Sequence, residues 1–425
     1  MTTSLDALLA FLRASVTPFH ATRELVCALE KQGFQPLPAI DTLCPGQGYY
    51  TTRNGSGLVA FRVGDGPADA GIRLVGAHTD SPNLSVKPQP LKVRQGTAQL
   101  AVDVYGGALL NPWFDRDLSL AGRVSYVDEQ GQLRNALVNF ERPIAIIPSL
   151  AIHLDREANA NRSVNPQRDI LPLLQLAQQE SDFDFHALLA EQLKQEHNLD
   201  ETVRILDYEL SLYDSQPAAL VGVRNDFIAS ARLDNLLSCF CGLQALLQAP
   251  TTQWSFLVCN DHEEVGSVST VGAQGPMLTD VLYAITDGSQ SLRKLRENSW
   301  MLSVDNAHAV HPNFSDKHDD NHGPILGAGP VIKINRNQRY ATSGEGAARL
   351  KLLAEQCGVT VQSFVMRSDM ACGSTIGPLT AAETGIATTD IGLPTLAMHS
   401  IRELAATHDP EQLIELLGAF FDRKA

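Results

Sequence analysis

The sequence predicts an α/β fold that is interrupted by an inserted β-rich domain. Beyond residue 225, amphipathic helical patterns alternate with short apolar strands, which is typical of an α/β sheet. Residues 91–224 differ, because short β-like runs are broken there by Gly, Asn and Pro. A chain of 425 residues with 44% hydrophobic side chains is also long enough for two cores. We therefore expect one domain formed by residues 1–90 and 225–425, with residues 91–224 inserted into it.

Hydrophobic spacing places the individual elements along the chain. A period of three to four residues predicts helices, whereas compact apolar runs bounded by turn residues predict strands. The helices are expected at 5–12, 21–32, 234–248, 344–357 and 410–422. The strands are expected at 58–61, 72–76, 254–260, 300–305 and 359–365, and at 100–105 and 122–127 in the insertion. Residues 156–198 form the polar middle portion of the insertion.

The charge balance limits the classes of partner. The chain has 33 basic and 48 acidic residues, a formal net charge of −15. Nucleic acids and anionic membranes need a basic surface, so neither is expected as the main partner. An acidic substrate remains compatible with this composition, because a local Lys or Arg can outweigh a diffuse negative field at short range.

Cysteine usage and the amino terminus indicate an intracellular protein. The seven cysteines are an odd number without a C-x-x-C pair, which favours reduced thiols over a disulfide framework. Residues 1–16 form a charged amphipathic pattern and lack the apolar core of a signal peptide. No run approaches the roughly 18 apolar residues of a membrane span. We expect a soluble, cytoplasmic protein.

Two adjacent glutamates, Glu263 and Glu264, follow the strand expected at 254–260. Neighbouring side chains at a strand exit can diverge, one towards a metal ion and one towards its bound water. A zinc site that activates water needs this division, with one carboxylate fixing the cation and another free to take a proton. An ordinary acidic loop is the alternative, so the decision depends on finding further ligands.

Four other positions could supply these ligands. His78 ends a strand, and Asp80 is placed to fix the tautomer of its imidazole. Asp234 lies where a loop enters a helix, so an N-cap is the alternative to a metal ligand there. Asp305 ends another strand, and His399 follows an apolar run. Each position alone is more often structural, but the order His, Asp, Glu-Glu, Asp, His matches a two-zinc site with one shared carboxylate.

Seven motifs spread over nearly the whole chain form a more specific pattern than any one of them. They are GAHTDSP (76–82), NPWFDR (111–116), IPSLAIHL (147–154), RLDN (232–235), DHEEVGS (261–267), DNAHAVHP (305–312) and RSDMACGSTIGP (367–378). With these motifs the chain resembles the aspartyl aminopeptidases, which are cocatalytic zinc exopeptidases. The resemblance implies a zinc exopeptidase-type mixed sheet sandwiched by helices, with a β-rich insertion that serves in oligomerisation and in completing the active site.

The resemblance also implies the roles of the metal-site residues. One zinc ion would be held by His78, Asp234 and Asp305. The second would be held by Asp234, Glu264 and His399. Glu263 would act as the general base towards a zinc-activated water, and Asp80 would assist catalysis through His78. Manganese or cobalt could replace zinc, since sites with N and O ligands take several of these ions.

A preference for peptides with an amino-terminal Asp or Glu follows from the same resemblance. It implies that Lys333, Tyr340 and His308 line the substrate pocket, and that His153 is contributed by a neighbouring subunit of a tetrahedral homododecamer built from dimers. For Lys333 the alternative is a snorkelling lysine on an edge strand. For His153 the alternative is a metal ligand.

Two other classes of function compete with an acidic aminopeptidase. The first is another hydrolase with the same dinuclear centre, such as a deacylase, a dipeptidase or an aminopeptidase for neutral residues. The second is a scaffold that has kept the fold without activity. Loss of Glu263 would be the expected mark of such a scaffold, and Glu263 is present together with all five candidate ligands.

Overall fold

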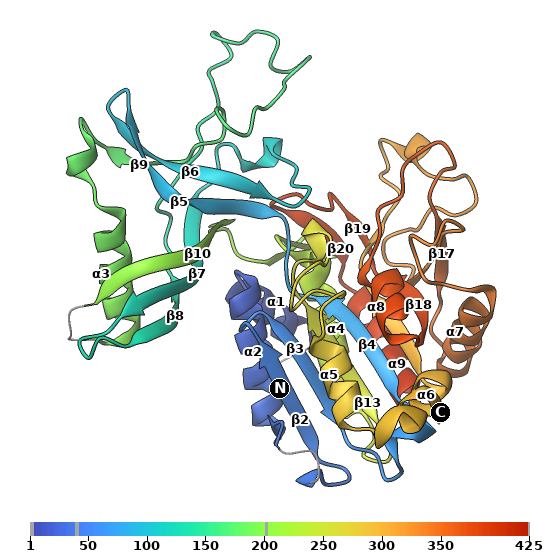
Figure 1. Cartoon of the computed structure of the whole chain (residues 1–425). Helices are drawn as coiled ribbons and strands as arrows, with labels where there is room; N and C mark the ends of the chain where they lie inside the picture. The colour runs from blue at the N-terminus through green and yellow to red at the C-terminus, as the bar shows by residue number, and fades with distance from the viewer. Residues whose placement is uncertain (1–3, 39–41, 200–202, 424–425) are drawn as a thin grey trace. The chain divides into compact units, whose positions relative to one another are not determined.

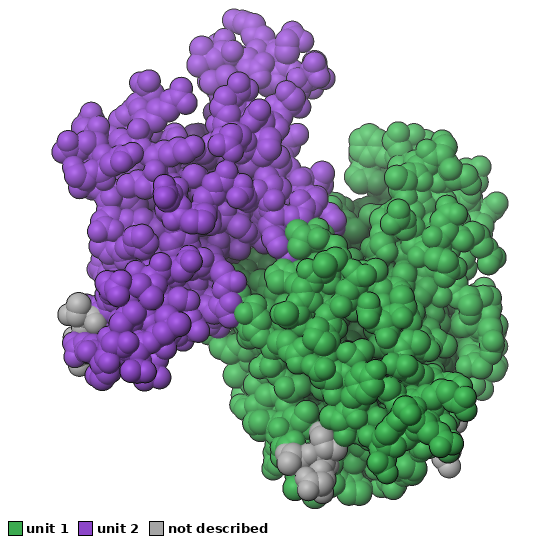
Figure 2. Space-filling view, in the orientation of Figure 1, with its two compact units in different colours: residues 1–80, 218–398, 403–425 green, residues 81–217, 399–402 purple. Residues whose placement is uncertain are grey.

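The chain forms two compact units in a computed structural model that describes residues 4–38, 42–199 and 203–423 (Figure 1). Unit 1 comprises residues 1–80, 218–398 and 403–425, and unit 2 comprises residues 81–217 and 399–402 (Figure 2). The insertion was expected to begin at residue 91. Unit 2 instead begins just before the long strand β5 (Asn83–Arg94), which runs through residue 91 without a break.

A nine-stranded mixed sheet is the centre of unit 1. Its spatial order is β1 (Gln35–Pro36), β2 (Gly48–Arg53), β3 (Gly57–Arg62), β13 (Ser255–Asn260), β4 (Arg73–His78), β14 (Trp300–Val304), β18 (Ala387–Gly392), β16 (Val331–Ile334) and β17 (Gln362–Val365). The four central strands β13, β4, β14 and β18 are parallel to one another. Their side chains are buried on both faces, as the apolar runs of the sequence predict for parallel strands.

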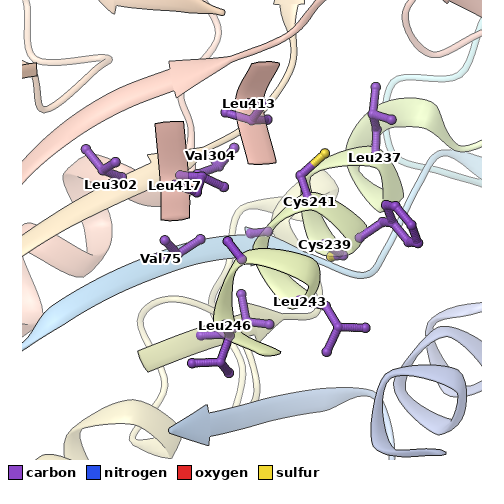
Figure 3. Packing of buried hydrophobic residues seen from close by; sticks show 14 of the residues in the cluster. Val75, Leu237, Cys239, Cys241, Leu243, Leu246, Leu302, Val304, Leu413 and Leu417 are labelled. Atoms are coloured by element: carbon purple, nitrogen blue, oxygen red, sulfur yellow. The ribbon is translucent and has the colours of Figure 1, made fainter. Parts of the chain in front are cut away.

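Helices cover both faces of this sheet, so the expected α/β sandwich is confirmed. The helices are α1 (Ser4–Ala14), α2 (Pro18–Lys31), α4 (Leu233–Gln248), α5 (Met277–Ala284), α6 (Gly288–Asn298), α7 (Gly344–Cys357), α8 (Ile376–Thr384) and α9 (Asp409–Asp422). Alternate residues of β4 point to opposite faces: Val75 packs in the core beneath α4 and α9, and Leu74 packs in the core beneath α5, α6 and α8. Figure 3 shows Val75, Leu302 and Leu417 in the first of these cores.

Local sequence signals account for where several helices begin and end. The Ser343 side chain caps α7 by accepting the N–H of Gly346, and Gly358 ends that helix in the left-handed conformation. Thr17 caps α2, and Pro18 stands at its first position, where a missing N–H costs nothing. The helix expected at 344–357 therefore has the predicted bounds.

A second, five-stranded sheet in unit 1 has the order β11 (Ala219–Val221), β12 (Phe227–Ser230), β20 (Glu403–Ala406), β19 (Pro394–Leu396) and β15 (Ala307–His308). Strands β12 and β20 pair antiparallel over their whole length. This sheet brings together segments from residues 219–230, 307–308 and 394–406.

Unit 2 is built on a six-stranded antiparallel sheet. Its order is β8 (Leu133–Asn139), β7 (Leu118–Val127), β10 (Arg204–Asp214), β5, β6 (Thr97–Tyr105) and β9 (Leu173–Leu176). The helix α3 (Phe185–His197) was not anticipated within the polar stretch of the insertion. Its apolar residues Phe185, Leu189 and Leu193 recur every four positions and pack against the sheet, but they are separated by polar and charged residues.

All seven cysteines are free thiols, as the sequence predicts. Among the helices that the described residues form, none combines the length and the apolar character needed to cross a bilayer.

The buried imidazole of His20 makes the stability of unit 1 depend on pH. Burial, with Arg23 and Arg232 adding to it, lowers the pKa of His20 to about 3. Because the unfolded chain binds this proton near pH 6.5, stability is lost as the pH falls from 6.5 towards 3. When the pH falls from 7 to 5, we expect the free energy of unfolding to decrease by roughly 2 kcal/mol less in His20→Gln than in the parent chain. Urea denaturation at the two pH values measures this difference.

The exposed His408 provides the matched control. His408→Gln should show the same loss between pH 7 and 5 as the parent. Equal pH profiles for His20→Gln and the parent would contradict the assignment to His20.

Candidate metal centre

Three neighbouring parallel strands deliver acidic and imidazole side chains to one edge of the large sheet. His78 is the last residue of β4, and it pairs with Asn260, the last residue of β13. Glu263 follows three residues later, and Asp305 directly follows β14 on the other side of β4. Because parallel strands place their carboxyl ends at the same edge, side chains far apart in the sequence meet there.

Asp80 orders the two glutamates and the histidine together. Its carboxylate accepts the backbone N–H of Glu263 at 3.1 Å and that of Glu264 at 3.0 Å. The Nδ1 atom of His78 lies 3.0 Å from the Asp80 carbonyl oxygen and 3.3 Å from a carboxylate oxygen. Since a carbonyl can only accept, Nδ1 carries the hydrogen and Nε2 is left for a cation. The sequence predicted the contact with His78, but the hold on the glutamate backbone emerges only from the structure.

Asp234 reaches the same place from the start of α4. The residue at the N-cap position is Arg232, in the left-handed conformation, and Asp234 itself has non-helical dihedral angles. Its N–H donates to the carboxylate of Glu403 at 2.9 Å. The neighbouring Asn235 ties this turn to β14 by donating to the carbonyl of Val304 at 2.8 Å. Asp234 thus stands at a kink just before the regular part of α4, with extended dihedral angles.

The candidate ligands form three overlapping groups. Within each group the ligand atoms lie within 4.8 Å of one another, and the groups are His78, Asp234 and Asp305; His78, Glu263 and Glu264; and Asp234, Glu264 and His399. The first two lie entirely within unit 1. His399 is the first residue of the short stretch 399–402 between two segments of unit 1.

The donor set suits zinc. His78 Nε2 lies 3.6 Å from Asp234, 3.9 Å from Asp305 and 4.0 Å from Glu263, each measured to a carboxylate oxygen. Atoms that bind one zinc ion at about 2.0–2.2 Å lie roughly 3–4 Å apart. Imidazole nitrogen and carboxylate oxygen are both ordinary zinc ligands. The residues present thus fit a zinc centre in type and in spacing.

Burial and like charge dominate the electrostatics of these residues. Burial raises the pKa of Glu263 to about 8; His78 opposes this rise and the neighbouring carboxylates add to it. Burial also raises the pKa of Asp305 to about 6, against the effect of Lys333. Burial lowers the pKa of His78, but hydrogen bonds to Asp234 and Asp80 outweigh it and raise that pKa well above its usual value. So much buried negative charge requires compensation, which protons or divalent cations can provide.

His399 has a fixed ring orientation. Its Nδ1 atom lies 3.2 Å from the carbonyl oxygen of Gly107, also in unit 2. As for His78, a carbonyl partner assigns the hydrogen to Nδ1 and leaves Nε2 as the donor to a cation.

Lys333 lies in the interior of unit 1. The side chain is 2% exposed, and β16 lies between β18 and β17, so it is not a snorkelling lysine on an edge strand. Its Nζ atom donates to the carbonyl of Asn306 at 3.0 Å and lies 3.5 Å from a carboxylate oxygen of Asp305. It also lies 5.1 Å from the ring centroid of Tyr340, which is buried.

The remaining candidate residues differ in their surroundings. His308 is exposed on β15, and its ring and that of Tyr340 both approach Phe364, at 6.0 and 6.3 Å between centroids. His153 is exposed in unit 2 and belongs to none of the three ligand groups found among the described residues.

Two buried carboxylates near these residues were not identified from the sequence. Glu403 accepts the N–H of Asp234, and Asp390 accepts hydrogen bonds from Ser303 and Thr375. Asp390 stands within the buried strand β18, whose sequence ATTDIG is half polar, so no apolar run pointed to it. Glu403 carried no signal either, because it opens a strand next to the polar stretch 399–402.

The matching family model is that of the aminopeptidase I zinc metalloproteases (M18), and it covers residues 11–421. A probable M18 family aminopeptidase 2 of Pseudomonas entomophila is 57% identical over 418 residues, 97% of each chain. A protein of the same name from Stutzerimonas stutzeri is 57% identical over 420 residues, 98% of this chain and 97% of that one.

Solved structures agree with this assignment. A structure of the Ape4 and Nbr1 complex matches with a TM-score of 0.94 at 38% identity, covering 98% of this chain and 85% of that chain. The mApe1 dodecamer of S. cerevisiae matches with a TM-score of 0.85 at 27% identity, over 98% and 96% of the two chains. The chain therefore belongs to the M18 family of zinc metalloproteases, and it is an aminopeptidase of that family.

Proposed function

We propose that this chain removes acidic amino-terminal residues from peptides at a dinuclear zinc site. The observation that carries the proposal is the ligand group of His78, Asp234 and Asp305 within unit 1. A second zinc ion would share Asp234 and would be held in addition by Glu264 and His399. Each proposed zinc ion has one imidazole, one carboxylate of its own and the shared carboxylate, as the order of residues in the sequence suggested. Manganese or cobalt suits the same donors.

The two adjacent glutamates have different roles in the proposed chemistry. Bound zinc would activate a water molecule and polarise the scissile carbonyl. Glu264 belongs to the group that contains Asp234 and His399, whereas Glu263 belongs to neither of the two groups that contain Asp234. We infer that Glu263, whose carboxylate lies 4.0 Å from His78 Nε2, takes a proton from the attacking water and passes it to the leaving amine. Asp80, which holds the backbone of both glutamates, keeps this carboxylate in position.

The general-base assignment predicts a specific defect for Glu263→Gln. The variant should lose about 10²–10⁴-fold in kcat, because only proton transfer is removed, and its zinc content should stay that of the parent. Glu345→Gln, at an exposed position on α7, is the control and should retain full activity. Full turnover by Glu263→Gln would exclude this role.

The buried cation favours an acidic substrate side chain. Lys333 and Tyr340 lie beside the metal-site residue Asp305, and burial makes a charge act more strongly than it would at the surface. We infer that Lys333 pairs with the side chain of an amino-terminal Asp or Glu, and that Tyr340 and His308 complete the pocket wall.

Turnover of chromogenic substrates with amino-terminal Asp, Glu or Leu tests the proposal. We expect kcat/KM for the acidic substrates to exceed that for Leu by at least about ten-fold, the size of one charge-assisted hydrogen bond. A chelator should abolish all turnover, and metal analysis should give two zinc ions per chain. Equal cleavage of Asp and Leu substrates would contradict the acidic preference. Full activity with the chelator would contradict the metal site.

Lys333→Met extends the same test to the proposed pocket. It should depress turnover of the acidic substrates by at least about ten-fold while the Leu substrate and the zinc content change little. Lys351→Met, an exposed lysine on α7, serves as the matched control.

We also propose that the chain assembles into a homododecamer. The yeast relative is a dodecamer, and residues 150–154 of unit 2 expose Leu150, Ile152 and Leu154 around His153. Apolar side chains gathered in this way mark a protein interface. In this proposal the inserted unit serves oligomerisation, and His153 reaches the substrate pocket of a neighbouring subunit. The free thiols support the cytoplasmic location that we propose.

Light scattering on the purified protein gives the mass of the assembly. We expect about twelve chains per particle, by analogy with the relative. A single-chain mass with full activity would rule out a role for a neighbouring His153.

A further inference from the structure

A row of three polar side chains crosses the large sheet of unit 1 beside the candidate site. Ser303 of β14 pairs with Asp390 of β18. On the other side of β18, Ile332 pairs with Ile391 in an antiparallel ladder, so the next position in this register places Lys333 opposite Asp390. Directly opposite residues of neighbouring strands lie on one face and close enough to interact.

Asp390 is fully buried and accepts three hydrogen bonds. They come from the Ser303 hydroxyl at 2.8 Å, the Thr375 hydroxyl at 2.5 Å and the backbone N–H of Ala341 at 2.6 Å. Each donor belongs to a different segment around the pocket: β14, the start of α8, and the loop that carries Tyr340. One carboxylate therefore ties these three segments together.

Asp390 also lies opposite a buried lysine in the register of the sheet, and the charge of that lysine acts on it. Lys333 has Asp305 as its other carboxylate neighbour, at 3.5 Å. In the proposed function Asp305 shares its charge with a zinc ion, and this leaves Asp390 as the carboxylate that balances Lys333. A buried ammonium without such a partner is strongly unfavourable. Consistent with this interaction, the charge of Lys333 opposes the rise that burial causes in the pKa of Asp390.

We propose that Asp390 is a positioning residue for substrate selectivity, which holds the Lys333 ammonium and the Tyr340 segment in place for the acidic side chain of the substrate. The inference rests on the proposed function, since it takes Lys333 and Tyr340 as pocket residues. The start of α8 approaches this carboxylate closely, because a Cβ atom on Gly377 would lie 2.5 Å from both of its oxygens.

Asp390→Asn is the variant that tests the proposal. Asparagine keeps the size of the side chain but removes its charge, and its amide nitrogen cannot accept the N–H of Ala341. We expect the ratio of kcat/KM between Asp- and Leu-terminated substrates to fall at least about ten-fold, mainly through a higher KM for the acidic substrate. Zinc content should stay unchanged.

A second buried aspartate supplies the matched control. Asp409 in α9 is equally buried and accepts the N–H groups of Gly327 and Gly329 at 2.9 and 3.1 Å. Asp409→Asn thus loses comparable hydrogen bonds at a site that is not part of the proposed pocket. It should lower the Tm and leave the substrate ratio as in the parent. A lower Tm with an unchanged ratio in Asp390→Asn would show a purely structural role and overturn the proposal.

A double-mutant cycle separates this inference from the proposed function. In a Lys333→Met background, Asp390→Asn should reduce kcat/KM by a smaller factor than in the parent, because the part of its effect that passes through Lys333 is already lost. Independent, additive effects would overturn the positioning role even if the enzyme prefers acidic substrates. If the parent enzyme shows no preference for acidic substrates, the proposed specificity is wrong. The same double-mutant cycle, measured on whichever substrate is cleaved, still shows whether the effects of the two residues are coupled.

Ser303→Ala covers the case in which Asp390→Asn does not fold. It removes one hydrogen bond to the carboxylate and leaves the charge in place. We expect the substrate ratio to fall about two- to five-fold, in the range of one hydrogen bond. An unchanged ratio in a folded Ser303→Ala enzyme would contradict the proposal.

Discussion

The concentration of negative charge at one edge of a buried parallel sheet is the constraint on which the candidate site depends. His78 and Asp305 stand at the ends of adjacent strands, and Glu263 and Glu264 follow the strand on the other side. The sheet places them there through apolar packing on both faces, so the charge cannot spread out without disrupting two cores. A divalent cation compensates several carboxylates at once and accepts imidazole in addition, which makes a zinc site the natural complement of this arrangement.

The smaller sheet of unit 1 supports the same site from another direction. Strand β12 leads directly into the turn that contains Asp234, and β20 begins with Glu403, whose carboxylate accepts the N–H of that residue. Because β12 and β20 are paired, Asp234 and its anchor are fixed relative to each other by backbone hydrogen bonds. Asn235 then joins this turn to the end of β14 in the large sheet. The separation between carboxylates from the two sheets is thereby set by ordinary secondary structure.

The sequence was informative where a functional side chain stands at the end of a clear hydrophobic pattern. It was less informative where the pairing of strands determines which side chains meet. The strand exits at His78, Glu263 and Asp305 followed from apolar runs that stop at polar residues, and the capped helix at 344–357 was predicted with its observed bounds. The role of Asp390 could not be predicted, because its partner Ser303 becomes visible only when the order and register of the strands are known. For Asp234 the sequence showed only a loop that enters a helix, and the kink that places this residue before the regular part of α4 is visible only in the structure.

An acidic substrate preference in a chain of net charge −15 requires a local reversal of the potential. Most of the acidic residues are exposed, and salt screens their fields over about 8 Å. Lys333 is buried, so its charge acts through a medium of lower polarity and is felt more strongly by a substrate group bound against it. Such a charge is tolerated only with a fixed carboxylate near it, and that carboxylate must have its own oxygens engaged so that it does not replace the substrate. In the inference drawn above, Asp390 meets the second of these conditions through its three hydrogen bonds.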